Sequence, residues 1–179
     1  MFFSTYDITL LNWLHSHLIP HSVPVLQVIS DTTTMVSIAL VILVVILSLA
    51  KKSKPLRMKF FMLVTVLLLV TAVTQGLKAL IDRDRPFTTF PYIEKLSSGG
   101  DSSFPSGHTL EAFAVAAAIS LLFSKKRIII PVYAWAILVA YSRMALGVHY
   151  PTDVLAGIVI GTLIGWVVPW VFGRVFRTL

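Results

Sequence analysis

The amino-acid sequence predicts an all-α protein: a polytopic transmembrane bundle of five or six spanning helices with an N-terminal interfacial helix, forming a single domain over residues 1–179. Three observations predict this class. Hydrophobic residues make up 56% of the chain and charged residues only 13%, which is more apolar than a soluble domain. Several apolar runs approach the ~20 residues that cross a bilayer as a helix. The charges between these runs are distributed unequally, as in membrane proteins.

The first 31 residues differ from the rest because polar and apolar residues are mixed. Leucine and isoleucine recur at helical spacing within "DITLLNWLHSHL", so we expect residues 1–31 to form an amphipathic segment lying in the membrane interface. Pro20 and Pro24 should interrupt this segment. The alternative is a sixth, poorly apolar crossing helix over residues 5–29. The start of the chain lacks the basic residues and cleavage site of a signal peptide.

Five apolar runs follow and supply the predicted spans. These are residues 34–50, 58–80, 107–123, 128–146 and 153–172. The longest connection, residues 87–104, contains Gly99 and Gly100 as candidate hinges and is expected to form a lid or headgroup site.

Basic residues gather in three segments that fall on one face if the spans alternate. Five lie in residues 51–59, three in residues 125–127 and two in the C-terminal tail, out of 15 in the chain. The positive-inside tendency makes this face cytoplasmic. The opposite, outer face holds all five histidines and most carboxylates. The net charge of +7 therefore reflects loop asymmetry and not nucleic-acid binding. The small size favours a bacterial cytoplasmic membrane, with the chemistry on the extracytoplasmic side.

Three polar motifs fall at the outer ends of the predicted spans. They are K-x6-R-P at residues 78–86, P-S-G-H at residues 105–108 and S-R-x5-H-x3-D at residues 142–153.

These motifs combine the groups that bind a phosphate. Lys78, Arg85 and Arg143 are cations, which are costly near hydrocarbon unless they meet anions. Arginine offers a planar fork suited to phosphate oxygens, and lysine offers a point charge. Ser106 and Gly107 stand where unpaired amides at a helix N-terminus form an anion site. The five residues are candidate phosphate ligands.

The same motifs contain two histidines and a carboxylate. Asp153 follows His149 by four residues, and such a carboxylate fixes the histidine tautomer and stabilises its modified form. His108 is a second histidine, available as an acid. Phosphoryl transfer needs cations, a nucleophile and an acid for the leaving oxygen, and the motifs offer each of them.

The three motifs, in this order and spacing, resemble the signatures of the type 2 phosphatidic acid phosphatase family without departure at any signature position. The resemblance implies a metal-independent phosphatase of membrane lipids that needs no cofactor. It implies that His149 is a nucleophile forming a phosphohistidine, that Asp153 orients it, and that His108 is the general acid. It implies phosphate binding by Lys78, Arg85, Ser106, Gly107 and Arg143.

Glu111 lies outside the signatures, three residues after His108 and on the same helix face. A carboxylate at this depth should face the bundle interior and find a partner. Two interpretations stand side by side. In one, Glu111 tunes His108 or contacts a polar substrate headgroup; in the other, it makes a structural hydrogen bond to Ser142 or to a neighbouring helix.

Two metal-binding interpretations are weaker. Asp82 and Asp84 form a D-x-D pattern, but arginines interleave the carboxylates, so ion pairing within the motif accounts for them. His15, His17 and His21 do not share one helix face. We expect no metal site here.

The expected partners are the lipid bilayer and a membrane lipid phosphate; nothing in the sequence predicts an oligomeric state. Candidate substrates are undecaprenyl diphosphate, phosphatidylglycerophosphate, phosphatidate and a lipid A phosphate, between which the motifs do not choose. Two rival functions are a lipid phosphotransferase, which passes the phosphoryl group to another lipid, and a non-catalytic lipid-binding or transport protein.

Overall fold

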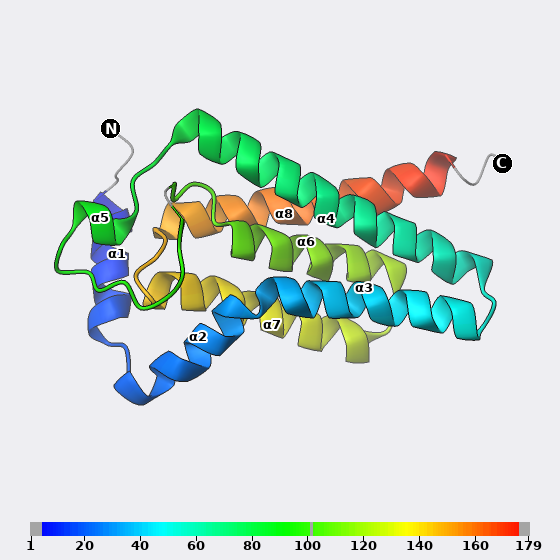
Figure 1. Ribbon diagram of the computed structural model, residues 1–179, viewed down its shortest axis with the longest axis horizontal. Helices are drawn as coiled ribbons and strands as arrows, with labels where there is room; N and C mark the ends of the chain where they lie inside the picture. The colour runs from blue at the N-terminus through cyan, green and yellow to red at the C-terminus, as the bar shows by residue number, and fades with distance from the viewer. Residues whose placement is uncertain (1–4, 101, 176–179) are drawn as a thin grey trace.

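The computed structural model describes residues 5–100 and 102–175, and all regular structure in these residues is helical (Figure 1). This confirms the predicted all-α class. The elements in chain order are α1 (Thr5–Ser16), η1 (Pro20–Ser22), α2 (Val23–Asp31), α3 (Thr33–Ala50), α4 (Lys54–Ile81), α5 (Pro86–Thr89), α6 (Gly107–Leu122), α7 (Lys126–Ala145) and α8 (Pro151–Val175).

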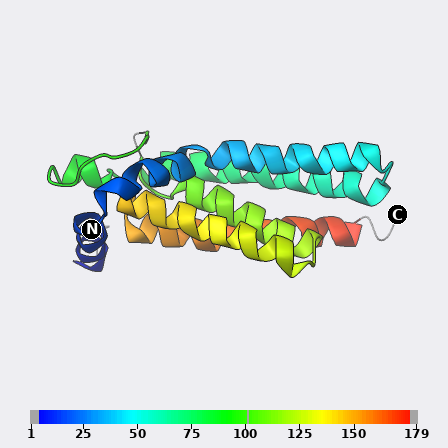
Figure 2. The ribbon, with the colours of Figure 1, turned by 90° about the horizontal axis from the view of Figure 1, so that it is seen from below.

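Four helices form an elongated bundle around a fifth. Helices α3, α4, α7 and α8 are long and apolar enough to cross a membrane. Helix α6 has 16 residues and packs against all four of them, so its middle turns are buried in protein (Figures 1 and 2). A helix enclosed by other helices contacts little lipid and need not match the bilayer thickness by itself. The predicted count of five or six spans stays a prediction.

The N-terminal segment is a pair of helices at one end of the bundle. Pro20 opens η1, and the chain turns there between α1 and α2, so residues 5–29 do not form one continuous helix. Helix α1 lies across the ends of α7 and α8 (Figure 1). Its Leu11 and Asp7 side chains are buried. Helix α1 is therefore anchored to the bundle by both an apolar and a charged side chain.

Helices α6 and α8 approach closely along a line of glycines on α8. A methyl group at Gly161 would lie 2.3 Å from the carbonyl oxygen of Leu110, and one at Gly165 would lie 2.3 Å from that of Ala114. Glycine is needed here because any larger residue meets backbone atoms of α6. Small residues allow such close approach between membrane helices. This contact sets the N-terminal ends of the two helices side by side.

The two ends of the bundle differ in their connections. The α3–α4 loop, the α6–α7 loop and the C-terminal part of α8 lie at one end, together with the basic residues of 51–59 and 125–127 and with Arg174 of the third basic segment. Arg177 of that segment lies outside the described residues. The segment between α4 and α6 and the turn between α7 and α8 lie at the other end (Figures 1 and 2). The fold thus separates the charges as predicted, and it gathers all three motifs at the second end, which we call the motif end.

Candidate active site

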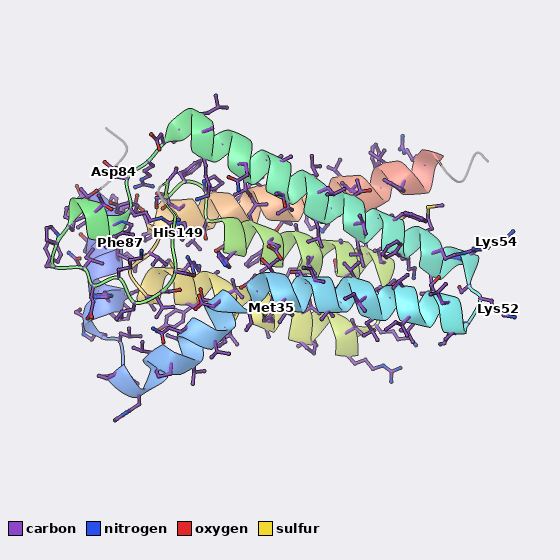
Figure 3. All side chains as sticks on the ribbon, viewed as in Figure 1. Met35, Lys52, Lys54, Asp84, Phe87 and His149 are labelled. Carbon is purple, nitrogen blue, oxygen red and sulfur yellow. The ribbon has the colours of Figure 1, made fainter. Side chains whose placement is uncertain are left out.

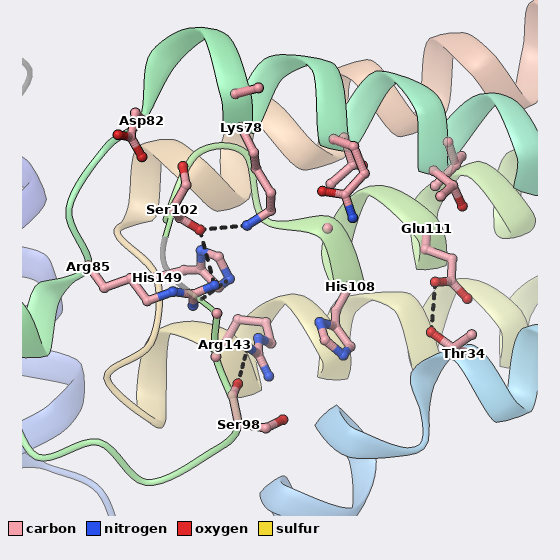
Figure 4. Close-up of a pocket in the computed structure, with 18 residues that line it drawn as sticks. Thr34, Lys78, Asp82, Arg85, Ser98, Ser102, His108, Glu111, Arg143 and His149 are labelled. Carbon is pink, nitrogen blue, oxygen red and sulfur yellow. Dashed lines mark hydrogen bonds between the residues drawn. The ribbon is translucent and has the colours of Figure 1, made fainter.

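A cavity of about 820 Å³ opens at the motif end. Its walls come from α3, α4, α6 and α7, from residues 98–100 and 102, and from the turn before α8. Most of the predicted site residues line it (Figure 4): Lys78, Arg85, Gly107, His108, Glu111, Arg143 and His149. Ser106 and Asp153 are not among its lining residues.

Lys78 and Arg85 converge on one backbone carbonyl. The oxygen of Ser102 accepts hydrogen bonds from Lys78 Nζ at 2.5 Å and from Arg85 Nη2 at 3.1 Å. Arg85 Nη1 also donates to the carbonyl of Val148 at 2.9 Å. Gly99 packs on this guanidinium, because a methyl group there would lie 2.8 Å from Nη1. The loop predicted as a lid therefore contacts the cations directly and fixes their positions.

Arg143 enters the cavity from the last turn of α7. Its Nη1 donates to the hydroxyls of Ser30 and Ser97, and its Nη2 donates to the carbonyl of Ser98 at 2.9 Å. Its Nε is buried and has no hydrogen-bond partner in the part of the chain that the structure describes. The guanidinium is held by neutral oxygens, so its positive charge is available to an anion in the cavity.

His149 is held with one ring nitrogen toward the cations and the other toward Asp153. Its Nε2 lies 3.3 Å from Arg85 Nη1, and its Nδ1 lies 3.6 Å from Asp153 Oδ2. Ser103 lies 3.5 Å from the same Nδ1 and donates to Asp153 Oδ2 at 2.5 Å. This arrangement favours the tautomer with its proton on Nδ1 and leaves the Nε2 lone pair on the cation side.

Burial keeps the His149 ring neutral. Desolvation, opposed by the nearby Asp153 and reinforced by Arg143 and Arg85, lowers the pKa of His149 to about 3. A neutral imidazole retains the lone pair that a nucleophile needs. The ring is therefore in its reactive protonation state at neutral pH.

Asp153 is fixed by a buried network that sequence reasoning missed. Its Oδ1 accepts from Arg83 Nη1 at 2.5 Å, and its Oδ2 also accepts from the amide of Tyr150 at 2.9 Å. Arg83 Nη2 in turn pairs with Asp7 of α1 at 2.9 Å. Asp7 accepts from the amide and the hydroxyl of Thr152 as well. The N-terminal helix is thus linked to the carboxylate that faces His149.

Arg83 is the middle residue of the D-x-D pattern formed by Asp82 and Asp84. We expected its charge to be used within the motif, but it forms ion pairs with Asp7 and Asp153 across the fold. Asp82 lines the cavity, and Asp84 is exposed (Figure 3). Over residues 5–100 and 102–175, no three His, Cys, Asp or Glu side chains gather as they would around a metal ion.

Ser106, which we expected to bind phosphate, does not line the cavity. Its side chain makes no capping hydrogen bond, and its hydroxyl instead pairs with that of Thr109 at 2.9 Å. Its amide donates to the Asp153 carbonyl at 3.1 Å and joins the starts of α6 and α8. Gly107 and His108 are the residues of the P-S-G-H motif that line the cavity.

Glu111 makes a hydrogen bond to a neighbouring helix, as the second of its two interpretations predicts. Its Oε2 accepts from the hydroxyl of Thr34 on α3 at 2.9 Å, whereas Ser142 donates to the Val139 carbonyl. Glu111 also lines the cavity, so this bond does not settle the choice between the two interpretations.

The N-terminal histidines form local contacts. His15 lies 3.2 Å from the Ala145 carbonyl and accepts from the amide of Glu94 at 3.3 Å, which joins α1 to the end of α7. His17, directly after α1, contacts the carbonyl of Trp13 on that helix.

A membrane helical bundle with a neutral histidine, a supporting carboxylate and three cations around one cavity defines a class of phosphate-handling membrane proteins. The family model described as "PAP2 superfamily" matches residues 59–177, and the chain belongs to this superfamily.

Relatives with curated names match over less than half of their own length. A lipid A 4'-phosphatase of Bacteroides thetaiotaomicron is 36% identical over 77 residues, which is 43% of this chain and 34% of the relative. The undecaprenyl-diphosphatase BcrC of Bacillus subtilis is 37% identical over 76 residues, which is 42% of this chain and 38% of the relative.

Solved structures match over nearly the whole chain. The crystal structure of Aquifex aeolicus LpxE has a TM-score of 0.77 and 26% identity, over 92% of this chain and 95% of that one. A transmembrane PAP2-type phosphatidylglycerolphosphate phosphatase from Bacillus subtilis has a TM-score of 0.78 and 24% identity, over 95% and 86%. The latter likeness concerns the fold alone.

Proposed function

We propose that this protein is a metal-independent phosphatase of a membrane lipid phosphate, working through a phosphohistidine on His149 at the extracytoplasmic face of a bacterial cytoplasmic membrane. The observation that carries the proposal is the position of His149, whose Nε2 faces Arg85 while its Nδ1 faces Asp153. That geometry supplies a nucleophile beside a cation cluster.

The first half-reaction transfers the phosphoryl group to the protein. Nε2 of His149 attacks phosphorus, the bond from phosphorus to the leaving oxygen breaks, and that oxygen takes a proton from His108. Lys78, Arg85 and Arg143 balance the negative charge on the equatorial oxygens. These cations would exchange contacts with the carbonyls of the 98–102 segment for contacts with phosphate.

The second half-reaction releases phosphate. Water attacks the phosphohistidine, gives its proton to His108, and the nitrogen–phosphorus bond breaks. Asp153 faces the Nδ1–H of the imidazole throughout, without taking its proton, and stabilises the positive charge of the ring in the intermediate. Every step uses side chains of this chain, so no metal ion is required.

A lateral opening supports a lipid as the substrate. Thr34 on α3 and Thr71 and Gln75 on α4 line the cavity and are also exposed. An acyl or isoprenyl chain could therefore remain in the bilayer between α3 and α4 while its phosphate reaches His149.

The test is phosphate release from purified lipid phosphates in detergent, with EDTA present. We expect turnover in chelator, and loss of at least about 1000-fold in His149→Ala with the fold retained. His21→Ala, at an exposed histidine outside the cavity, is the matched control and should be unaffected. Activity that disappears in EDTA and returns with Mg²⁺ would contradict the metal-independent mechanism.

Brief quenching with a radiolabelled substrate tests the intermediate. We expect label on the wild-type protein that is stable to base and labile to acid, and none on His149→Ala. Label that appears on a second lipid, and not as inorganic phosphate, would identify a phosphotransferase. No cleavage of any lipid or aryl phosphate would favour the non-catalytic alternative.

A further inference from the structure

The cavity continues past the phosphate-binding groups into a second polar region. In the view of Figure 4, His108 lies between His149 and Glu111, and all three side chains line the cavity. Glu111 stands three residues beyond His108 on α6, about 4.5 Å further along the helix axis. Both side chains line the same cavity, with Glu111 one turn further into the bundle than His108.

Two polar atoms in this region are buried without partners. Glu111 Oε1 has no hydrogen bond, although Oε2 accepts from Thr34. On the facing helix α4, Thr74 Oγ1 is also buried and without a partner among the described residues. Thr74 precedes Lys78 by one turn, just as Glu111 follows His108 by one turn. Glu111 and Thr74 both line the cavity, and Thr74 lies beside the start of α6, because a methyl group at Gly107 would lie 3.1 Å from its Cγ2.

A buried polar atom without a partner is destabilising, so a ligand that supplies the missing hydrogen bond is favoured. A carboxylate oxygen accepts hydrogen bonds, and a threonine hydroxyl both accepts and donates. An alcohol hydroxyl can therefore donate to Glu111 or accept from Thr74. A phosphate in this place would put negative charge against a carboxylate in a setting of low dielectric.

We propose that Glu111 and Thr74 form a leaving-group subsite that selects phosphomonoesters whose alcohol carries a free hydroxyl close to the ester oxygen, and that disfavours diphosphates. This rests on the proposed function and narrows it. The chemistry fits the glycerol of phosphatidylglycerophosphate or a sugar of a lipid A phosphate. It does not fit phosphatidate, which has no such hydroxyl, or an isoprenyl diphosphate, whose leaving group is itself an anion.

The sharpest probe is a pair of substrates that differ by one hydroxyl. Phosphatidylglycerophosphate and its analogue with 1,3-propanediol in place of the headgroup glycerol share the phosphate, the acyl chains and the leaving-group length. We expect kcat/KM to be about 10–100-fold higher for the glycerol compound, the range for a hydrogen bond to a charged group. Glu111→Ala should remove the difference by slowing the glycerol compound alone.

For a diphosphate substrate, we expect a substitution of Glu111 to raise kcat/KM instead of lowering it. Glu111→Gln keeps the shape but removes the negative charge, so kcat/KM for an isoprenyl diphosphate relative to phosphatidylglycerophosphate should rise about tenfold. Ser120→Ala on α6, whose hydroxyl bonds only within its own helix, is the control and should change neither ratio.

The outcomes separate the two proposals. Equal slowing of both matched substrates in Glu111→Ala would show a purely structural role and overturn the subsite. A wild-type preference for the isoprenyl diphosphate that Glu111→Gln leaves unchanged would overturn it as well, with phosphatase activity intact. Faster turnover of a lipid A phosphate than of phosphatidylglycerophosphate would assign the hydroxyl to a sugar. No release from any substrate, including an aryl phosphate, would overturn the proposed function and this subsite together.

Discussion

The two ends of the bundle carry the same kind of cationic side chain in opposite settings. At the motif end, Arg83, Arg85 and Arg143 are 5%, 3% and 1% exposed. At the other end, Lys52 and Lys54 are exposed and point away from the bundle (Figure 3). A buried cation must be matched by acceptors, whereas an exposed one is solvated. The motif end meets this requirement with carbonyls, hydroxyls and carboxylates drawn from α1, α2, α8 and the 98–102 segment.

The chain has a net charge of +7, but few of its cations lie where they can contact a phosphate in the cavity. The exposed lysines at one end are solvated, and each contributes little to stability by itself. At the motif end, most of the cations are held by contacts from elsewhere in the fold. We therefore expect single substitutions at the two ends to differ strongly in their effects.

The largest effect should come from Arg83. Arg83→Leu would leave Asp7 and Asp153, both nearly fully buried, without their shared cation. Breaking a buried ion pair in this way costs about 3–5 kcal/mol. Arg57→Leu, at an exposed arginine of the other end, should stay within about 0.5 kcal/mol. Denaturant unfolding in detergent measures both, and similar losses at the two sites would contradict the comparison.

A smaller effect should separate two glycines of α8, one near each end. A methyl group at Gly157 would lie 2.9 Å from the Ser106 carbonyl, whereas Gly173 has open space. Gly157→Ala should destabilise by about 1–3 kcal/mol because backbone atoms must move. Gly173→Ala should stabilise by about 0.5–1 kcal/mol, as alanine does in helices. Thermal unfolding tests this pair, and it fails if Gly157→Ala is tolerated as well as Gly173→Ala.

Much of this could be predicted from the sequence, for identifiable reasons. The helix bounds follow apolar runs, so α3 was expected at 34–50 and is found at Thr33–Ala50. The cavity gathers Lys78, Arg143 and His149 because each motif ends a span on the same face. The directions of the helices are enough to bring these residues to the same end of the bundle, so the motifs alone predict that they lie close together.

Other features carry weaker signals. Ser102 acts through its carbonyl, which is the same in every residue and leaves no trace in the sequence. The pairing of Asp7 with Arg83 joins residues 76 positions apart, and nothing local indicates it. The glycine line was available in "GIVIGTLIG", where the spacing of four residues predicts close helix packing.

Acid should weaken the motif end through His149. The pKa of this histidine is about 3 in the folded protein, while an exposed histidine has a pKa near 6.5. The unfolded chain therefore binds the proton first, and stability is lost progressively as the pH falls from about 6.5 toward 3. At pH 5.5 the loss is about 1.4 kcal/mol. His149→Gln should remove this part of the pH dependence of thermal unfolding, and an unchanged pH profile in that variant would contradict the assignment.

The smallest effect on activity should come from two cysteine substitutions that reveal which end faces outward. Thr88 lies in the connection at the motif end and Lys51 at the basic end, and both are exposed. Each variant should keep its activity within about twofold, since surface changes are mild. Because the natural chain has no cysteine, an impermeant thiol reagent added to intact cells reports each position alone. Positive-inside orientation predicts labelling of Thr88→Cys and protection of Lys51→Cys until the membrane is permeabilised.

The reverse labelling pattern would place His149 on the cytoplasmic side. The lipids it reaches would then be newly made inner-leaflet lipids and not those already displayed outside, while the chemistry of the cavity would stand.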